Sequence, residues 1–91
     1  MKAMKGSVDQ RLKTELKRLI VKECDLTIDI AEIGDDDLLF GSDSRLGLDS
    51  IDALQISIAV QNKYSLLIAD SKQLRKVMRS INTFADFIQP G

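Results

Sequence analysis

Ser50 is the residue whose type and position best suit chemistry, because it stands between acids where a helix is predicted to start. The stretch Asp49-Ser50-Ile51-Asp52 ends a polar turn, and an apolar helical pattern follows at once. Asp49 or Ser50 can cap the first backbone N–H groups, and Asp52 suits the positive end of the helix dipole. The Ser50 hydroxyl then either bonds back to the helix as a plain cap or points outward beside unpaired N–H donors, which would suit a phosphate.

Independent catalysis by Ser50 is not expected, because the chain contains no histidine. The commonest general base and the usual partner of a nucleophilic serine are therefore missing, and a His-liganded metal site is excluded. Cys24 is the single cysteine, so neither a disulfide framework nor a cysteine metal cluster is expected. We expect Cys24 to be buried on the apolar face of the first helix.

The charge distribution separates an acidic middle from basic flanks. The net charge is -1, yet Arg45 is the only basic residue between Glu23 and Asp52. An acidic surface disfavours nucleic acid and attracts basic protein partners, so we predict no nucleic-acid partner. The alternative is a solvated loop whose charges cancel against the flanks. Its acids at 35–37 do not follow the EF-hand spacing, because Leu39 and Phe40 stand at the fifth and sixth positions, and we predict no metal site.

The length of 91 residues predicts one small domain over 1–91, with residues 1–6 frayed. No apolar run is long enough to span a membrane, and no signal-peptide pattern opens the chain. We therefore expect a cytoplasmic protein that does not insert into membranes.

The first predicted helix is amphipathic and has roughly four turns. Ser7-Val8-Asp9-Gln10 fits the S-x-x-Q capping box at its start. The basic residues between its apolar positions are expected to form the solvent-exposed face. The apolar positions at helical spacing are Val8, Leu12, Leu16, Leu19, Ile20 and Cys24.

A long segment without periodicity follows, from Asp25 to Asp49. Loops of this length are uncommon in compact domains unless they are functional or disordered. Its scattered apolar residues predict that it is pinned to the core, with turns at Gly34, Gly41 and Gly47. A short helical turn is expected over 29–33.

The second helix is predicted from Ser50 to Lys63, and its apolar arc is wider than one buried stripe requires. Ile56 and Val60 belong to the face expected to be buried, together with Ala53 and Tyr64. A neighbouring side carries Ile51, Leu54 and Ile58. Either the helix is buried on two sides, or these residues form an exposed apolar strip beside Ser50, which usually marks a partner.

The rest of the chain predicts two further helices. After an inward-packed connection with Leu66, Leu67 and Ile68, a short third helix starts at Asp70, and a last helix starts at Thr83 and stops at Pro90-Gly91. The third helix carries the apolar residues Leu74, Val77 and Met78, and in the last helix Phe84, Phe87 and Ile88 are expected to face inward. The predicted fold is all-α: a small four-helix bundle of three main helices and a short third one, with a long loop between helices one and two.

Two stretches carry a family resemblance. Leu38-Leu39-Phe40-Gly41, followed by Leu46-Gly47-Leu48-Asp49-Ser50-Ile51-Asp52-Ala53-Leu54, resembles the signature of acyl carrier proteins, and the likeness extends from Val8 to Ile88. The resemblance implies that a phosphopantetheinyl transferase joins 4'-phosphopantetheine from coenzyme A to Ser50, making the chain a phosphoprotein. The thiol of this arm would carry acyl groups as thioesters, and the chain itself would perform no catalysis.

The resemblance also implies roles for the neighbours of Ser50. Asp49 would help the transferase place its metal and the coenzyme. Contacts with partner enzymes and acyl chains would come from Leu48, Ile51, Asp52, Leu54 and Ile58. The implied partners are acyl-transfer and ketoacyl-synthase type enzymes, and the chain is expected to be a monomer.

One departure bears on the pathway. Typical fatty-acid carriers have several glutamates along this second helix, whereas the exposed positions here hold Gln55, Gln61, Asn62 and Lys63. Fatty-acid-like, specialised lipid and polyketide-like biosynthesis all stay open, and the departure favours the specialised pathways. Two other functions also stay open: a non-carrier interaction domain of the same fold, and an aminoacyl or peptidyl carrier.

Overall fold

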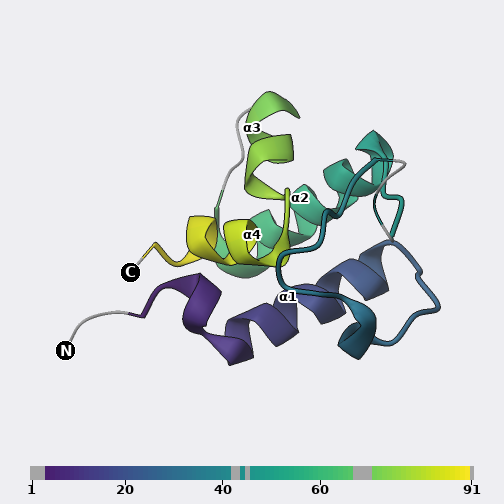
Figure 1. Ribbon diagram of the computed structural model, residues 1–91. Coiled ribbons are helices and arrows are strands. Elements are labelled where there is room, and N and C mark those ends of the chain that lie inside the picture. Colours follow the sequence, from purple (N-terminus) through teal and green to yellow (C-terminus); the bar gives the residue numbers. More distant parts are fainter. Residues whose placement is uncertain (1–3, 42–43, 45, 67–70, 91) are drawn as a thin grey trace.

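The computed structural model describes residues 4–41, 44, 46–66 and 71–90, and its regular backbone is helical (Figure 1). No strand occurs within these ranges, where Phe40 and Leu48 form an isolated parallel bridge. The predicted all-α class is confirmed. The elements in order are η1 (Gly6–Val8), α1 (Gln10–Glu23), η2 (Ile30–Glu32), α2 (Ser50–Tyr64), α3 (Ser71–Val77) and α4 (Ile81–Ile88).

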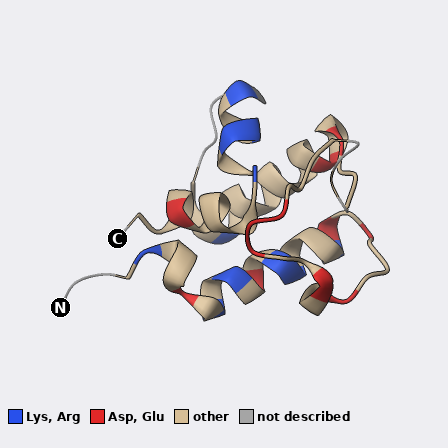
Figure 2. Cartoon of the chain, viewed as in Figure 1, with Lys and Arg blue, Asp and Glu red and all other residues tan. Residues whose placement is uncertain are grey.

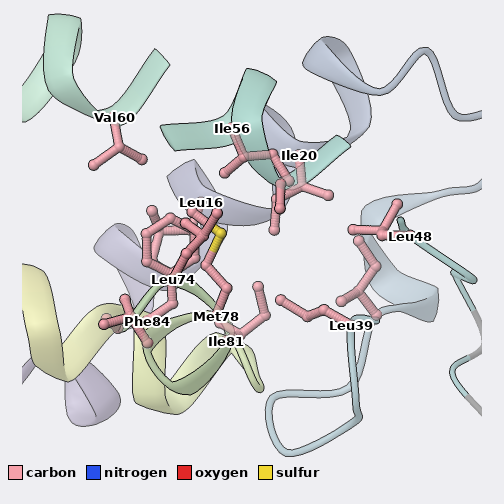
Figure 3. Packing of buried hydrophobic residues seen from close by; sticks show 14 of the residues in the cluster. Leu16, Ile20, Leu39, Leu48, Ile56, Val60, Leu74, Met78, Ile81 and Phe84 are labelled. Atoms are coloured by element: carbon pink, nitrogen blue, oxygen red, sulfur yellow. The ribbon is translucent and has the colours of Figure 1, made fainter. Parts of the chain in front are cut away.

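The core lies between α1, α2 and α4, and α3 closes one end of it (Figure 3). Ile56 and Val60 of α2 and Phe84 of α4 are fully buried, as the periodicity predicts. From α3 and the turn after it, Leu74, Val77 and Met78 are buried as well. Burial of apolar side chains from every helix gives the bundle its main stabilisation.

The predicted start of the first helix is wrong. Asp9, not Ser7, is the N-cap of α1, and its carboxylate accepts a hydrogen bond from the Leu12 N–H at 3.2 Å. Ser7 lies in η1, where its N–H donates to Asp86 Oδ1 at 2.9 Å. Val8 therefore falls outside α1 and is 59% exposed instead of buried.

The amino-terminal segment is docked onto α4 from Gly6 onward, although we expected residues 1–6 to fray. Gly6 is buried, and its N–H donates to the Gln89 carbonyl at 2.7 Å. A Cβ at this position would lie 1.9 Å from the Ala85 carbonyl oxygen, so only glycine allows the close approach.

The last helix begins earlier than its predicted start at Thr83. Ser80 caps α4: its hydroxyl accepts from the Thr83 N–H, and Thr83 Oγ1 accepts from the Ser80 N–H. This capping box brings Ile81 into the helix, where it is fully buried. Phe87, Ile88 and Leu66 are half-buried against the core, whereas Leu67, Ile68 and Asp70 lie outside the described residues.

The long loop is pinned to the core at both ends, as predicted. Ile33, Leu39 and Leu48 are buried, and Asp29 caps the short helix η2 with a capping box that Glu32 completes. The predicted helical turn over 29–33 is therefore confirmed. Cys24, expected to be buried, is only half-buried just after α1.

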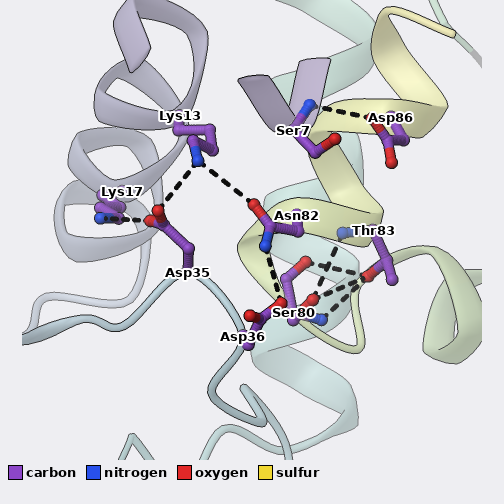
Figure 4. Close-up of polar contacts among 9 residues, drawn as sticks. All are labelled: Ser7, Lys13, Lys17, Asp35, Asp36, Ser80, Asn82, Thr83 and Asp86. Carbon is purple, nitrogen blue, oxygen red and sulfur yellow. Dashed lines mark hydrogen bonds and ion pairs between the residues drawn. The ribbon is translucent and has the colours of Figure 1, made fainter. Parts of the chain in front are cut away.

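A polar cluster around Lys13 holds the acidic part of the loop (Figure 4). Lys13, expected on the solvent-exposed face of α1, is only 4% exposed. Its Nζ lies 2.9 Å from Asp35 Oδ2 and 3.3 Å from Asn82 Oδ1, and Lys17 Nζ lies 2.7 Å from Asp35 Oδ1. The Asn82 N–H donates to the Asp35 carbonyl, and its side-chain amide donates to Asp36. The loop is thereby tied to α1 and α4 together.

Replacement of Ile56 by alanine tests the burial pattern on α2. We expect Ile56→Ala to lower the free energy of unfolding by about 2–5 kcal/mol, because the side chain is fully buried. Ile51→Ala is the matched control on the same helix. Ile51 is 65% exposed, so this change should cost less than about 0.5 kcal/mol. Urea denaturation of both variants measures the difference, and equal losses would contradict it.

Asp35→Asn tests the polar cluster through pH. Lys17 and Lys13 beside the carboxyl hold the pKa of Asp35 below its ordinary value. Such a group stabilises the fold above its unfolded pKa, and this contribution is lost as the pH falls through the lower folded pKa. At pH 7 the variant should be less stable by about 1–3 kcal/mol, and this deficit should shrink below about pH 4.

The measurement is urea denaturation of wild type and variant across that pH range. The control is Asp25→Asn, which removes the same charge from an exposed position without an ion pair among the described residues. A deficit that stays constant with pH would show that the carboxylate charge of Asp35 is not what stabilises the loop.

Candidate functional site

Asp49 is the N-cap of α2, and Ser50 is the first residue of the helix. Asp49 Oδ1 accepts hydrogen bonds from the N–H groups of Ile51 and Asp52, both at 3.0 Å. Asp52 Oδ2 accepts in return from the Asp49 N–H at 3.1 Å. This reciprocal capping box fixes the backbone on both sides of Ser50.

Asp49 therefore takes the capping role, and Ser50 is left exposed. Within the described part of the chain, the Ser50 hydroxyl makes no hydrogen bond. Three of the N–H donors that were expected to be unpaired beside it are not available, however. The N–H groups of Ile51, Asp52 and Ala53 all donate to Asp49. An anion on Ser50 would thus have the Asp49 and Asp52 carboxylates as its sequence neighbours, and positive charge would have to come from elsewhere.

Ser50 opens onto a groove of about 1090 Å³ between α2, α3 and the loop. Buried apolar side chains of Leu48, Ala53 and Leu74 line it, with half-buried Phe40 beside them. Such a surface suits an apolar ligand with a few polar groups at its ends. The remaining lining residues described are Leu38, Gly41, Asp49, Leu54, Ser57, Lys72, Arg75 and Arg79.

Backbone hydrogen bonds of the loop shape this groove. The Leu39 N–H donates to the Arg79 carbonyl at 3.1 Å, which joins the loop to the end of α3. The Leu48 N–H donates to the Leu39 carbonyl, and the Gly41 N–H donates to the Leu48 carbonyl, both at 3.3 Å. Gly41 and Gly47 have φ angles of 93° and 59°, which favour glycine. The loop thus folds back on itself and delivers Asp49 and Ser50 to the rim.

The sequence-predicted contact residues separate into two groups. Leu48 and Leu54 lie with Asp49 and Ser50 in the groove, although Leu48 is only 3% exposed and lines its floor. Ile51, Leu54 and Ile58 are 65%, 57% and 51% exposed, so the exposed apolar strip is confirmed and buried packing on two sides is excluded. Asp52 is half-buried and belongs to the capping box. Leu54 connects the strip with the groove.

Sequence reasoning missed the basic side of the groove. Lys72, Arg75 and Arg79 come from α3 and the turn that follows it, and all three line the groove that Ser50 also lines. Figure 2 shows basic residues on α3 and acidic residues along the long loop. Lys72 and Arg75, three residues apart, share one face of α3, and this spacing was the available signal; Arg79 follows in the turn.

The thiol of the single cysteine, Cys24, is shifted away from its reactive form. Burial raises the pKa of the Cys24 thiol to about 11, and the Asp52 carboxylate adds to this shift. Because the thiolate is the reactive form, a thiol with this pKa stays protonated and inert at neutral pH.

Comparison with known proteins does not assign the chain to a family. No family model matches it, and no curated protein matches it either. Among the described helices, none has the length and apolar character needed to cross a membrane.

Replacements at Asp49 and Ser50 test which of the two caps α2. Asp49→Ala should lower the free energy of unfolding by about 1 kcal/mol, because two N–H groups lose their acceptor. Asp49→Ser should retain most of that stability, since serine is also a good cap. Ser50→Ala should change it by less than about 0.5 kcal/mol. Thermal and urea denaturation measure all three, and an equal loss in Ser50→Ala and Asp49→Ala would contradict the assignment.

Proposed function

We propose that this protein is an acyl carrier whose Ser50 hydroxyl receives 4'-phosphopantetheine. The observation that supports it best is the exposed, unbonded hydroxyl of Ser50 at the rim of an apolar groove. A serine that served only the helix would cap it, and here Asp49 does so. The sequence resemblance to acyl carrier proteins around this serine points to the same function.

The residues around Ser50 fit such an arm. Its hydroxyl is accessible to an incoming phosphate, and the floor formed by Leu48, Ala53 and Leu74 offers apolar contact along the groove. When bound, the arm supplies the thiol that holds an acyl group as a thioester. The chain needs this supply, because Cys24 is half-buried and its thiol stays protonated.

In this proposal the chain is a substrate of a phosphopantetheinyl transferase and not a catalyst. No histidine is present to activate Ser50, so the base must belong to the transferase. Asp49 uses Oδ1 for both capping bonds, which leaves Oδ2 for the metal and coenzyme that the transferase brings. The exposed strip of Ile51, Leu54 and Ile58 is the proposed contact for this enzyme and for later acyl-transfer and ketoacyl-synthase type enzymes.

The proposed pathway is specialised lipid or polyketide-like biosynthesis in the cytoplasm, with the carrier as a monomer. Gln55, Gln61 and Asn62 are exposed on α2 and carry no charge, so a basic fatty-acid enzyme finds few acids there. The exposed strip also favours a second candidate, an interaction domain in which Ser50 is never modified. An aminoacyl or peptidyl carrier would share the arm and differ only in cargo.

Intact mass spectrometry tests the attachment site. After incubation with coenzyme A and a broad-specificity transferase, the wild type should gain one arm, and Ser50→Ala should gain none. The control is Ser57→Ala, because Ser57 lines the same groove but donates its hydroxyl to the Leu54 carbonyl at 2.7 Å. This control should gain the arm normally. An unmodified wild type would favour the interaction domain, and an arm mapped to another serine would overturn the site.

A further inference from the structure

Three cations of the groove have no anionic partner within the described part of the chain. Lys72, Arg75 and Arg79 are exposed side chains that line it, and the ion pairs among the described residues involve only Lys13 and Lys17 with Asp35. Cations gathered beside an apolar surface attract an anion and raise its local concentration. Among the residues that the structure describes, no carboxylate forms an ion pair with this positive side of the groove.

The groove has opposite charges on its two sides. Asp49 lies beside Ser50 at the start of α2, whereas Lys72 and Arg75 belong to α3 and Arg79 to the turn after it. The same groove is also lined by the buried apolar side chains of Leu48, Ala53 and Leu74. A ligand anchored at Ser50 and lying in this groove would thus meet both apolar contact and the positive charge of the α3 side.

We infer that the cargo of this carrier is an acyl group with a second acid group, a carboxylate remote from the thioester. Lys72, Arg75 and Arg79 bind this carboxylate. This inference rests on the proposed attachment at Ser50. Arginine guanidinium groups suit a carboxylate because they can donate two parallel hydrogen bonds to it. A purely apolar acyl chain would use the floor of the groove and leave Lys72, Arg75 and Arg79 without a ligand.

The phosphate that joins the arm to Ser50 is a poorer counter-charge for these cations. It is covalently held on the α2 side, where Asp49 and Asp52 flank the attachment residue. The thioester and its acyl group are the parts of the arm that can move toward α3. The position of the cations thus favours recognition of the cargo over recognition of the linkage.

The experiment compares two cargoes of about the same length on the arm, a glutaryl group with a free carboxylate and a neutral hexanoyl group. The variant combines Lys72→Gln, Arg75→Gln and Arg79→Gln, and melting curves confirm that it is folded. The control is Lys76→Gln, which removes an exposed cation of α3 that is not among the lining residues. NMR spectra of the arginine side chains and the rate of thioester hydrolysis are the two measurements.

We expect the glutaryl group, but not the hexanoyl group, to shift the arginine signals of the wild type. The glutaryl thioester should hydrolyse about two- to fivefold faster in the triple variant than in the wild type, the ratio that an exposed ion pair provides. The hexanoyl rate should be the same in both proteins, and Lys76→Gln should behave like the wild type. Added salt should remove the difference.

Several results would overturn the inference. Equal effects of the two cargoes would show that the carboxylate is not recognised. Arginine shifts that appear with the empty arm, and do not change with cargo, would assign the cations to the phosphate linkage. Equal shifts from free glutarate on the unmodified protein would show a site independent of the arm. If mass spectrometry finds no arm on Ser50, the proposed function fails together with this inference. The other results above contradict only the inference about the cargo.

Discussion

The buried ammonium group of Lys13 is the constraint on which the placement of the long loop depends. A charge taken out of water must be paired and hydrogen-bonded, or it opposes folding. Lys13 meets this requirement with Asp35 from the loop and Asn82 from α4, and Lys17 adds a second cation beside Asp35. The loop, α1 and α4 therefore have to come together in one arrangement, because separating any of them would leave the buried ammonium group of Lys13 without one of its partners.

The contacts of Asp35 with Lys13 and Asn82 limit the path of the second half of the loop. Asn82 also holds the backbone of Asp35, and four residues later the Leu39 N–H reaches the Arg79 carbonyl. Both contacts lie at the junction of α3 and α4, so the loop approaches the groove from the side of α3. The burial of Leu39 and Leu48 then turns the chain back toward the start of α2. Ser50 is thus positioned by residues more than thirty positions away in both directions.

The sequence predicts the helices and their buried faces because apolar spacing reports directly on packing; Ile56, Val60 and Phe84 follow from it. It also identifies Asp49, Ser50, Leu48 and Leu54 as neighbours in one site. The N-cap residues are harder to predict from the sequence. Ser7 and Asp9 are both good candidates for the start of α1, and the docking of the amino-terminal segment onto α4 decides between them. The burial of Lys13 could not be predicted this way, because the sequence pattern of a lysine on a helix face does not depend on whether its side chain is solvated or paired with Asp35. The role of Lys72, Arg75 and Arg79 as groove residues could not be predicted either, because the groove forms only when the loop and α3 come together.

The capping of α2 by Asp49 determines both the freedom of the Ser50 hydroxyl and the electrostatics beside it. Asp49 accepts the hydrogen bonds of the Ile51 and Asp52 N–H groups, so Ser50 is not needed as the N-cap of α2. The Asp49 carboxylate also occupies the positive end of the helix dipole. Under the proposed function, an attached phosphate would find the N–H groups of Ile51, Asp52 and Ala53 already paired with Asp49, and side chains across the groove would add positive charge. Lys72, Arg75 and Arg79 belong to α3 and the turn after it, whereas Ser50 begins α2. Under the proposals made above, attachment would therefore depend on one wall of the groove and recognition of the cargo on the other, because the capping of α2 by Asp49 leaves Ser50 free.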